Sequence, residues 1–82
     1  MKEFIVKFSN TNDIVIFTKI ADEFKENIDV RSHDNHYVVD AKSIMGLLSL
    51  GIPKEIFIVI HTNNKDVISK FEEDISKWKV EE

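Results

Sequence analysis

The run IFIVIHT, residues 56–62, constrains the fold of this chain more than any other segment. It is dense in β-branched and aromatic residues, which favour a strand. Apolar residues occupy neighbouring positions, so both faces of the strand are apolar, and a strand at the edge of a sheet would leave much of that surface in water. The run therefore predicts a strand inside a sheet.

Three other segments are predicted to be strands. FIVKF (residues 4–8) alternates, with Phe4, Val6 and Phe8 directed inward. Residues 28–32 also alternate, and Tyr37-Val38-Val39 begins a further strand. Between these two lies HDNH, residues 33–36, whose Asp-Asn pair favours a turn. The two segments therefore predict a hairpin.

Apolar residues at helical spacing predict three helices. The first follows the polar cluster SNTND (residues 9–13) and is expected to end at Asn27. The second runs from Ser43 to about Leu50, before the stop signals Gly51 and Pro53. The third follows the capping residues Asn63 and Asn64. Its apolar stripe is Val67, Ile68, Phe71, Ile75 and Trp78, and that of the first helix is Ile14, Phe17, Ile20, Ala21 and Phe24.

The order of elements, β-α-β-β-α-β-α, predicts an α+β fold. Helices with one apolar stripe each suit a two-layer sandwich, in which all three pack on one face of a four-stranded antiparallel sheet. Its core is expected to hold Phe8, Phe17, Phe24, Leu47, Leu50, Phe71 and Ile75. A chain of 82 residues is enough for a single domain, 1–82.

Composition excludes several classes of function. The chain has no Cys, so it has neither disulfides nor a thiolate site, which suits a cytoplasmic protein. A net charge of −4 argues against direct binding of nucleic acid. The longest apolar runs are too short to span a membrane, and the start MKEFIVKFSN lacks the long apolar core of a signal peptide.

Enzymatic activity and metal binding are not expected either. His33 and His36 flank the predicted turn and His61 ends a strand, so the three do not form a ligand set of the usual spacing. No serine lies in a G-x-S-x-G sequence. A phosphate-binding loop would need glycines, and the only two are Gly46 and Gly51, in and just after a helix. We expect no catalytic residue, no metal and no cofactor.

The second helix has more apolar residues than one face can hold. At 100° per residue, Leu47 and Leu50 fall on one side and can enter the core. Ile44, Met45 and Leu48 then form a second apolar face. Exposed apolar clusters often mark docking sites, and Met suits an adaptable surface. The alternative is that a loop or a dimer contact covers this face.

Ser43 is explained completely as the N-cap of this helix, with a stabilisation of roughly 1 kcal/mol. A phosphate on its hydroxyl would meet free N–H groups and the positive end of the helix dipole. Phosphorylation would thus be tolerated and would change the charge beside the apolar face.

AKSIMGLLSLGIPKEIFIVI, residues 41–60, resembles the regulatory-serine segment of HPr, the phosphocarrier of the bacterial sugar phosphotransferase system. It is most similar to the catabolite-repression relative of HPr that lacks the phosphorylatable histidine. The resemblance implies an open-faced sandwich with strand order 1-4-2-3. It also implies that Ser43 is the serine phosphorylated by HPr kinase. Ile44, Met45, Leu48 and Val15 would then contact partner proteins.

The carrier loop of the family, G-[IL]-H-A-R-P-A, has no counterpart here. Alignment on Ala21 and Phe24 places Asn10 at the histidine position, Asn12 at the arginine position and Asp13 at the proline position. Asn has no imidazole nitrogen to accept a phosphoryl group, and Asp13 adds negative charge. The resemblance therefore implies a protein without carrier activity.

The leading hypothesis is a regulatory binding protein, not an enzyme, switched at Ser43. Its partners by resemblance are HPr kinase and either a catabolite-control repressor or phosphotransferase-system proteins. Two alternatives remain open: a working phosphocarrier that uses another histidine, and a diverged HPr-fold interaction module in which Ser43 is only a cap.

Overall fold

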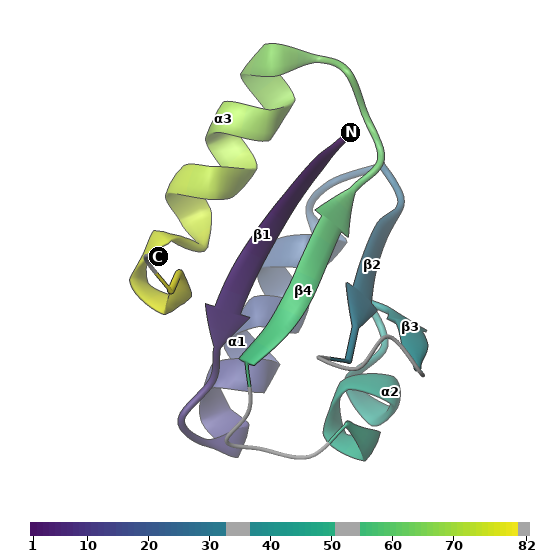
Figure 1. Cartoon of the computed structure of the whole chain (residues 1–82), viewed down its shortest axis with the longest axis vertical. Helices are drawn as coiled ribbons and strands as arrows, with labels where there is room; N and C mark the ends of the chain where they lie inside the picture. The colour runs from purple at the N-terminus through teal and green to yellow at the C-terminus, as the bar shows by residue number, and fades with distance from the viewer. Residues whose placement is uncertain (33–36, 51–54, 81–82) are drawn as a thin grey trace.

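The computed structural model describes residues 1–32, 37–50 and 55–80. Its four strands form one antiparallel sheet in the order β1-β4-β2-β3 (Figure 1). The strands are β1 (Lys2–Lys7), β2 (Ile28–Arg31), β3 (Val38–Asp40) and β4 (Glu55–Ile60). The predicted interior position of the apolar strand is confirmed, since β4 pairs with β1 on one side and with β2 on the other.

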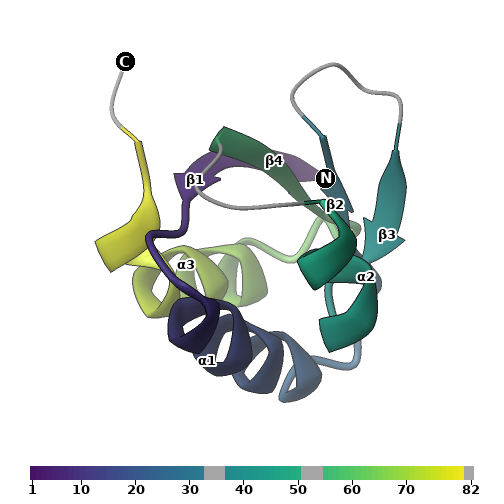
Figure 2. The same cartoon turned by 90° about the horizontal axis from the view of Figure 1, so that it is seen from below.

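The helices pack on a single face of this sheet, as Figure 2 shows. They are α1 (Thr11–Asp22), α2 (Ile44–Ser49) and α3 (Lys65–Asp74), and a turn of 3₁₀ helix, η1 (Ser76–Trp78), follows α3. No helix of the described residues covers the other face. The predicted open-faced α+β sandwich is confirmed, including the strand order 1-4-2-3.

Each helix begins at a polar residue whose side chain accepts a backbone hydrogen bond. Asn10 Oδ1 accepts from the N–H of Asp13, Ser43 Oγ from that of Gly46, and Asn64 Oδ1 from those of Asp66 and Val67. These bonds satisfy N–H groups that the first turn of a helix leaves without intrahelical partners. The caps thus fix the starting points of the helices.

The core lies between the helices and the inward side of the sheet. Ile28 and Val30 of β2 are buried there, whereas Asp29 and Arg31 point to the open face, as alternation along a strand requires. Of the predicted core residues only Phe24 is half-buried, and its ring still packs edge-on against Phe71. The buried members are Phe8, Phe17, Leu47, Leu50, Phe71 and Ile75.

The first helix is shorter than predicted. It ends at Asp22, with bonds from the N–H of Glu23 to the carbonyl of Ile20 and from the N–H of Phe24 to that of Ala21. These tighter i to i−3 bonds close the helix early, and the following polar residues lead to β2. The expected turn at 33–36 and the stop at Gly51 and Pro53 lie outside the described residues.

The chain after η1 returns to the outer edge of β1. Lys79 forms an isolated antiparallel bridge with Val6, and the N–H of Val80 donates to the carbonyl of Ile5. In the described part of the chain, no helix is long and apolar enough to cross a bilayer.

Candidate docking surface and the loop before the first helix

Two hydrogen bonds close the loop before α1. The N–H of Asp13 donates to Asn10 Oδ1 at 2.9 Å, and the N–H of Ser9 donates to Asp13 Oδ2 at 3.2 Å. This arrangement is similar to a capping box, except that the carboxylate of Asp13 accepts from Ser9 and not from the N-cap residue Asn10. Asn12 is exposed beside it. An amide and a carboxylate in these roles hold the helix start and offer no nitrogen nucleophile for phosphoryl transfer.

Ser43 is the N-cap of α2. Its Oγ lies 3.1 Å from the amide nitrogen of Gly46, and its carbonyl accepts from the N–H of Leu47 at 3.1 Å. The residue is half-buried. Capping therefore uses one acceptor position of a hydroxyl that has a second lone pair and its own proton.

The two sides of α2 differ sharply in exposure. Leu47 is 2% exposed and Leu50, at the end of the helix, 8%, so both belong to the core. Met45 is 78% exposed and Leu48 42%. Ile44 lies between these extremes: it is half-buried and packs against the core. The exposed arc of the helix is thus formed by Met45 and Leu48, with Ile44 at its inner margin.

A depression of about 280 Å³ separates α2 from α1. Val15, the residue expected to extend the apolar face, lies in it together with Ile44. The structure therefore brings these two residues together, although they are far apart in the sequence. Polar residues complete the lining: Thr18, Lys19, Asp22 and Lys42.

Sequence reasoning missed the polar lining of this depression. Lys42 Nζ donates to the carbonyl of Phe24 at 2.5 Å. This bond connects the segment between β3 and α2 with the segment that follows α1. On α1, Thr18, Lys19 and Asp22 follow Val15 at intervals of three or four residues, so they share its face. That spacing could have indicated that these residues line a surface together with Val15. It did not do so because polar residues at the same spacing also form an ordinary solvated helix face.

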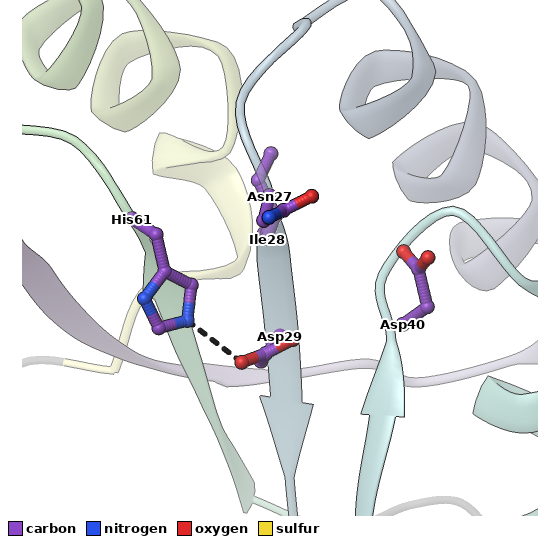
Figure 3. A pocket seen from close by; sticks show the side chains of 5 residues that line it. All are labelled: Asn27, Ile28, Asp29, Asp40 and His61. Carbon is purple, nitrogen blue, oxygen red and sulfur yellow. Dashed lines mark hydrogen bonds and ion pairs between the residues drawn. The ribbon is translucent and has the colours of Figure 1, made fainter.

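The described histidine, His61, directly follows β4 and lies beside Asp29 of β2 (Figure 3). Its Nε2 lies 2.7 Å from Oδ2 of Asp29, across the β4–β2 pair. Both residues line a second depression, of about 310 Å³, together with Asp40 at the end of β3. Among described residues, no group of three or more His, Asp or Glu side chains is arranged to hold a metal ion. His33 and His36 lie outside the described residues.

Comparison with known proteins agrees with this architecture. The family described as PTS HPr component phosphorylation site matches residues 13–76. HPr-C-His from Thermoanaerobacter tengcongensis is 26% identical, with a TM-score of 0.72 over 94% of this chain and 93% of that one. No curated protein matches the chain.

Two other solved structures support the fold alone, because their identity to this chain is low. The histidine-containing phosphocarrier protein of a Mycoplasma is 22% identical, with a TM-score of 0.70 over 93% of this chain and 89% of that one. Phosphocarrier protein HPr from Bacillus anthracis is 22% identical, with a TM-score of 0.66 over 90% and 95%. With a family match that covers most of its residues, this chain belongs to the HPr family.

Proposed function

We propose that this protein is a non-catalytic regulatory binding protein of the phosphotransferase system. It acts as a single domain, 1–82, and needs no cofactor. Partners dock on the surface formed by Val15, Ile44, Met45 and Leu48, and phosphorylation of Ser43 switches that docking. We call these four residues the docking surface.

The exposure of Met45 and Leu48 beside Ser43 is the observation that carries this proposal. Two large apolar side chains in water add nothing to the stability of the monomer, whereas burial against a partner gains roughly 25 cal/mol per Å². The half-buried Val15 and Ile44 extend the same surface into the depression beside α1. The distinct exposures of Leu47 and Met45 support a helix with one side for the core and one for a partner.

Loss of carrier activity is supported by the role of Asn10. Its side-chain oxygen is engaged in capping α1, and residues 1–32 contain no histidine. The family match begins at residue 13, after Asn10 and Asn12. A phosphoryl group from enzyme I would therefore find no acceptor where the family carries one.

A switch at Ser43 follows from charge and position. A phosphate adds about −1.5 to −2 charges and three strong acceptor oxygens. One of these oxygens can accept from the N–H of Gly46 in place of Oγ, so the helix start is kept. The docking surface would then be bordered by an anion, which attracts a basic partner and repels an acidic one.

The partners we propose are proteins of this regulatory circuit. HPr kinase would modify Ser43, and a catabolite-control repressor or phosphotransferase-system proteins would bind the docking surface. A net charge of −4 disfavours direct contact with nucleic acid. The setting is bacterial catabolite repression in the cytoplasm.

Incubation with phosphoenolpyruvate and enzyme I tests the loss of carrier activity. We expect no acid-labile phosphate on the protein, because Asn10 cannot form phosphohistidine. An Asn10→His change alone should restore little transfer, since Asn12 and Asp13 still replace the cationic loop. Stoichiometric acid-labile phosphorylation of the wild-type chain would overturn this part of the proposal.

The docking surface is tested by capture of purified HPr kinase and a catabolite-control repressor, with and without ATP. Met45→Lys should abolish capture and leave the unfolding free energy within about 0.5 kcal/mol, because the side chain is exposed. Tyr37→Lys is the matched control, since Tyr37 is also exposed but lies beside β3. Equal capture by Met45→Lys and wild type would contradict the docking role.

The two alternatives give different results in the same assays. A carrier that uses another histidine would yield acid-labile phosphate, and His61→Gln would remove it if His61 were the acceptor. His61 is a poor site for this, because the carboxylates of Asp29 and Asp40 would repel a phosphoryl group. A diverged module in which Ser43 is only a cap would gain no acid-stable phosphate from HPr kinase.

A further inference from the structure

The open face of the sheet carries a charge pattern that is complementary to itself. This face looks away from α1, and the strands lie in front of that helix in Figure 1. On its two central strands, β2 contributes Asp29 and Arg31, and β4 contributes Phe57 and Val59. Their register pairs Asp29 with Val59 and Arg31 with Phe57. The result is a four-residue block with an anion on one side and a cation on the other, beside the half-buried Phe57 and beside Val59, which neighbouring side chains already bury.

The block has two rows, the pair Asp29–Val59 and the pair Arg31–Phe57. The line between these rows passes through Val30 and Ile58, which are paired and point into the core. Two copies can stack their sheets face to face about a two-fold axis that runs along this line, midway between the two sheets. The strands of the second copy then run in the opposite direction. Asp29 then faces Arg31 of the other copy, and Val59 faces Phe57 of the other copy. Each contact occurs twice, as an interface with two-fold symmetry requires.

Arg31 is the cation of this block and is half-buried. Its Nε is buried without a hydrogen-bond partner among the described residues, so a second copy can reach only the outer nitrogens of the guanidinium group. Asp29 of that copy can supply an acceptor for them, because its bond to His61 occupies only part of the capacity of a carboxylate.

The same axis also brings the ends of β4 together. His61 lies three positions from Ile58 in one direction and Glu55 three positions in the other, so His61 of one copy faces Glu55 of the other. Both are exposed. An axis parallel to the strands would instead leave Asp29 near Asp29 of the other copy. The charges therefore select one of the two symmetric ways to stack the sheets.

We propose that the open face is a self-association surface, on which two copies of this chain stack their sheets face to face with Asp29 of each against Arg31 of the other. The surface is separate from the docking surface on α2, so the proposal does not rest on the proposed function. It leaves α2 accessible in both copies.

The size of the open face predicts a weak dimer. Four strands about 4.8 Å apart and five residues about 3.3 Å apart cover roughly 300 Å² per copy. Stable interfaces bury about 800 Å² per partner, so we expect a weak, transient dimer. In sedimentation velocity the chain should be largely monomeric at about 20 µM and should associate detectably at about 1 mM.

Two single charge reversals provide the decisive test. Asp29→Lys and Arg31→Glu each place like charges in contact in their own dimers, so each variant alone should associate at least about tenfold more weakly than wild type. In an equimolar mixture, the new Lys faces the new Glu and the two original residues face each other. The mixture should therefore associate as wild type does.

Wild-type chain that remains monomeric at about 1 mM would overturn the proposal. So would single variants that dimerise normally, or a mixture that stays monomeric. Circular dichroism checks that the variants fold. If a variant does not fold, the test is a dilution series of the wild-type chain observed by nuclear magnetic resonance. On dilution, the amide signals of Arg31 and Val59 should shift and those of Met45 and Leu48 should not. The opposite pattern would place the contact on α2 and refute the open-face dimer.

Discussion

At the scale of single residues, Asn10 and Ser43 perform the same structural task with different chemistry. Each caps the N-terminus of a helix by accepting a backbone hydrogen bond three residues on. The amide of Asn10 is inert toward a phosphoryl donor, whereas the hydroxyl of Ser43 can become a phosphate ester. A serine cap therefore leaves open a modification that an asparagine cap excludes.

The capping role of Ser43 leads to a prediction about stability. Ser43→Ala should lower the unfolding free energy by about 1 kcal/mol, because the N–H of Gly46 loses its acceptor. Ser43→Asp should retain most of that stability, since Asp also caps well. Urea denaturation measures both changes. Ser49→Ala is the control, because its hydroxyl donates to the carbonyl of Gly46 at an exposed site, and it should change stability by less than about 0.5 kcal/mol.

At the scale of elements, α2 depends on its neighbours for its existence. A helix of six residues is far too short to be stable alone in water. It is held by the buried Leu47 and Leu50 and by close approach to β3 at Gly46. A Cβ on Gly46 would lie 3.0 Å from Cβ of Val39 and 3.3 Å from Oγ of Ser43.

This close approach predicts that Gly46→Ala is destabilising, although Ala is the better helix former. Helix propensity would favour Ala by about 1 kcal/mol. Crowding costs about 1–3 kcal/mol, and Cβ of Val39 cannot yield without moving β3. We expect a net loss of about 1 kcal/mol in thermal or urea unfolding. A more stable variant would show that α2 can shift away from β3.

The elements also show what could be predicted from the sequence. The positions of β4 and α3 followed from local pattern, since burial of Ile58 and Phe71 is encoded by spacing along the chain. The pairing of His61 with Asp29 did not, because it depends on the register between two strands that are distant in sequence. The polar lining near Val15 was hidden for a related reason, as it forms only where α1 and α2 meet.

At the scale of the whole molecule, aromatic rings connect the layers. Phe8 of the chain after β1 packs on Phe17 of α1 and on Trp78 of η1, with ring centroids 5.2 and 5.4 Å apart. Phe17 also contacts Phe71 of α3. One cluster thus joins the chain after β1 with α1, α3 and η1. The ion pair between Glu72 and Lys79 involves the residues that directly follow Phe71 and Trp78.

That ion pair predicts a pH dependence of stability. The side-chain hydrogen bond from Lys79 lowers the pKa of Glu72 below its ordinary value of 4.5. The stabilisation that this ion pair provides is therefore complete above pH 4.5, and it is lost as the pH falls through the lower pKa of Glu72 in the folded state. Glu72→Gln should be less stable than wild type at pH ~7, and the difference should be smaller at pH ~3.

Urea unfolding at both pH values measures this difference. Glu73→Gln, at the neighbouring exposed position on α3, is the matched control and should show little difference at either pH. A Glu72→Gln variant as stable as wild type at neutral pH would mean that solvent screens the pair completely, as it does for many exposed pairs.

The order of the strands has a consequence for how the protein folds during synthesis. Among the four strands of the described sheet, β1 pairs only with β4, so β1 cannot form its strand pair until β4 has been synthesised. A nascent chain that stops before residue 55 can form the β2–β3 pair, but its β1 lacks any neighbour. Such non-local pairing slows folding. The apolar residues of β1 therefore stay unpaired until β4 has been synthesised, and during that interval a chaperone would have reason to hold this chain.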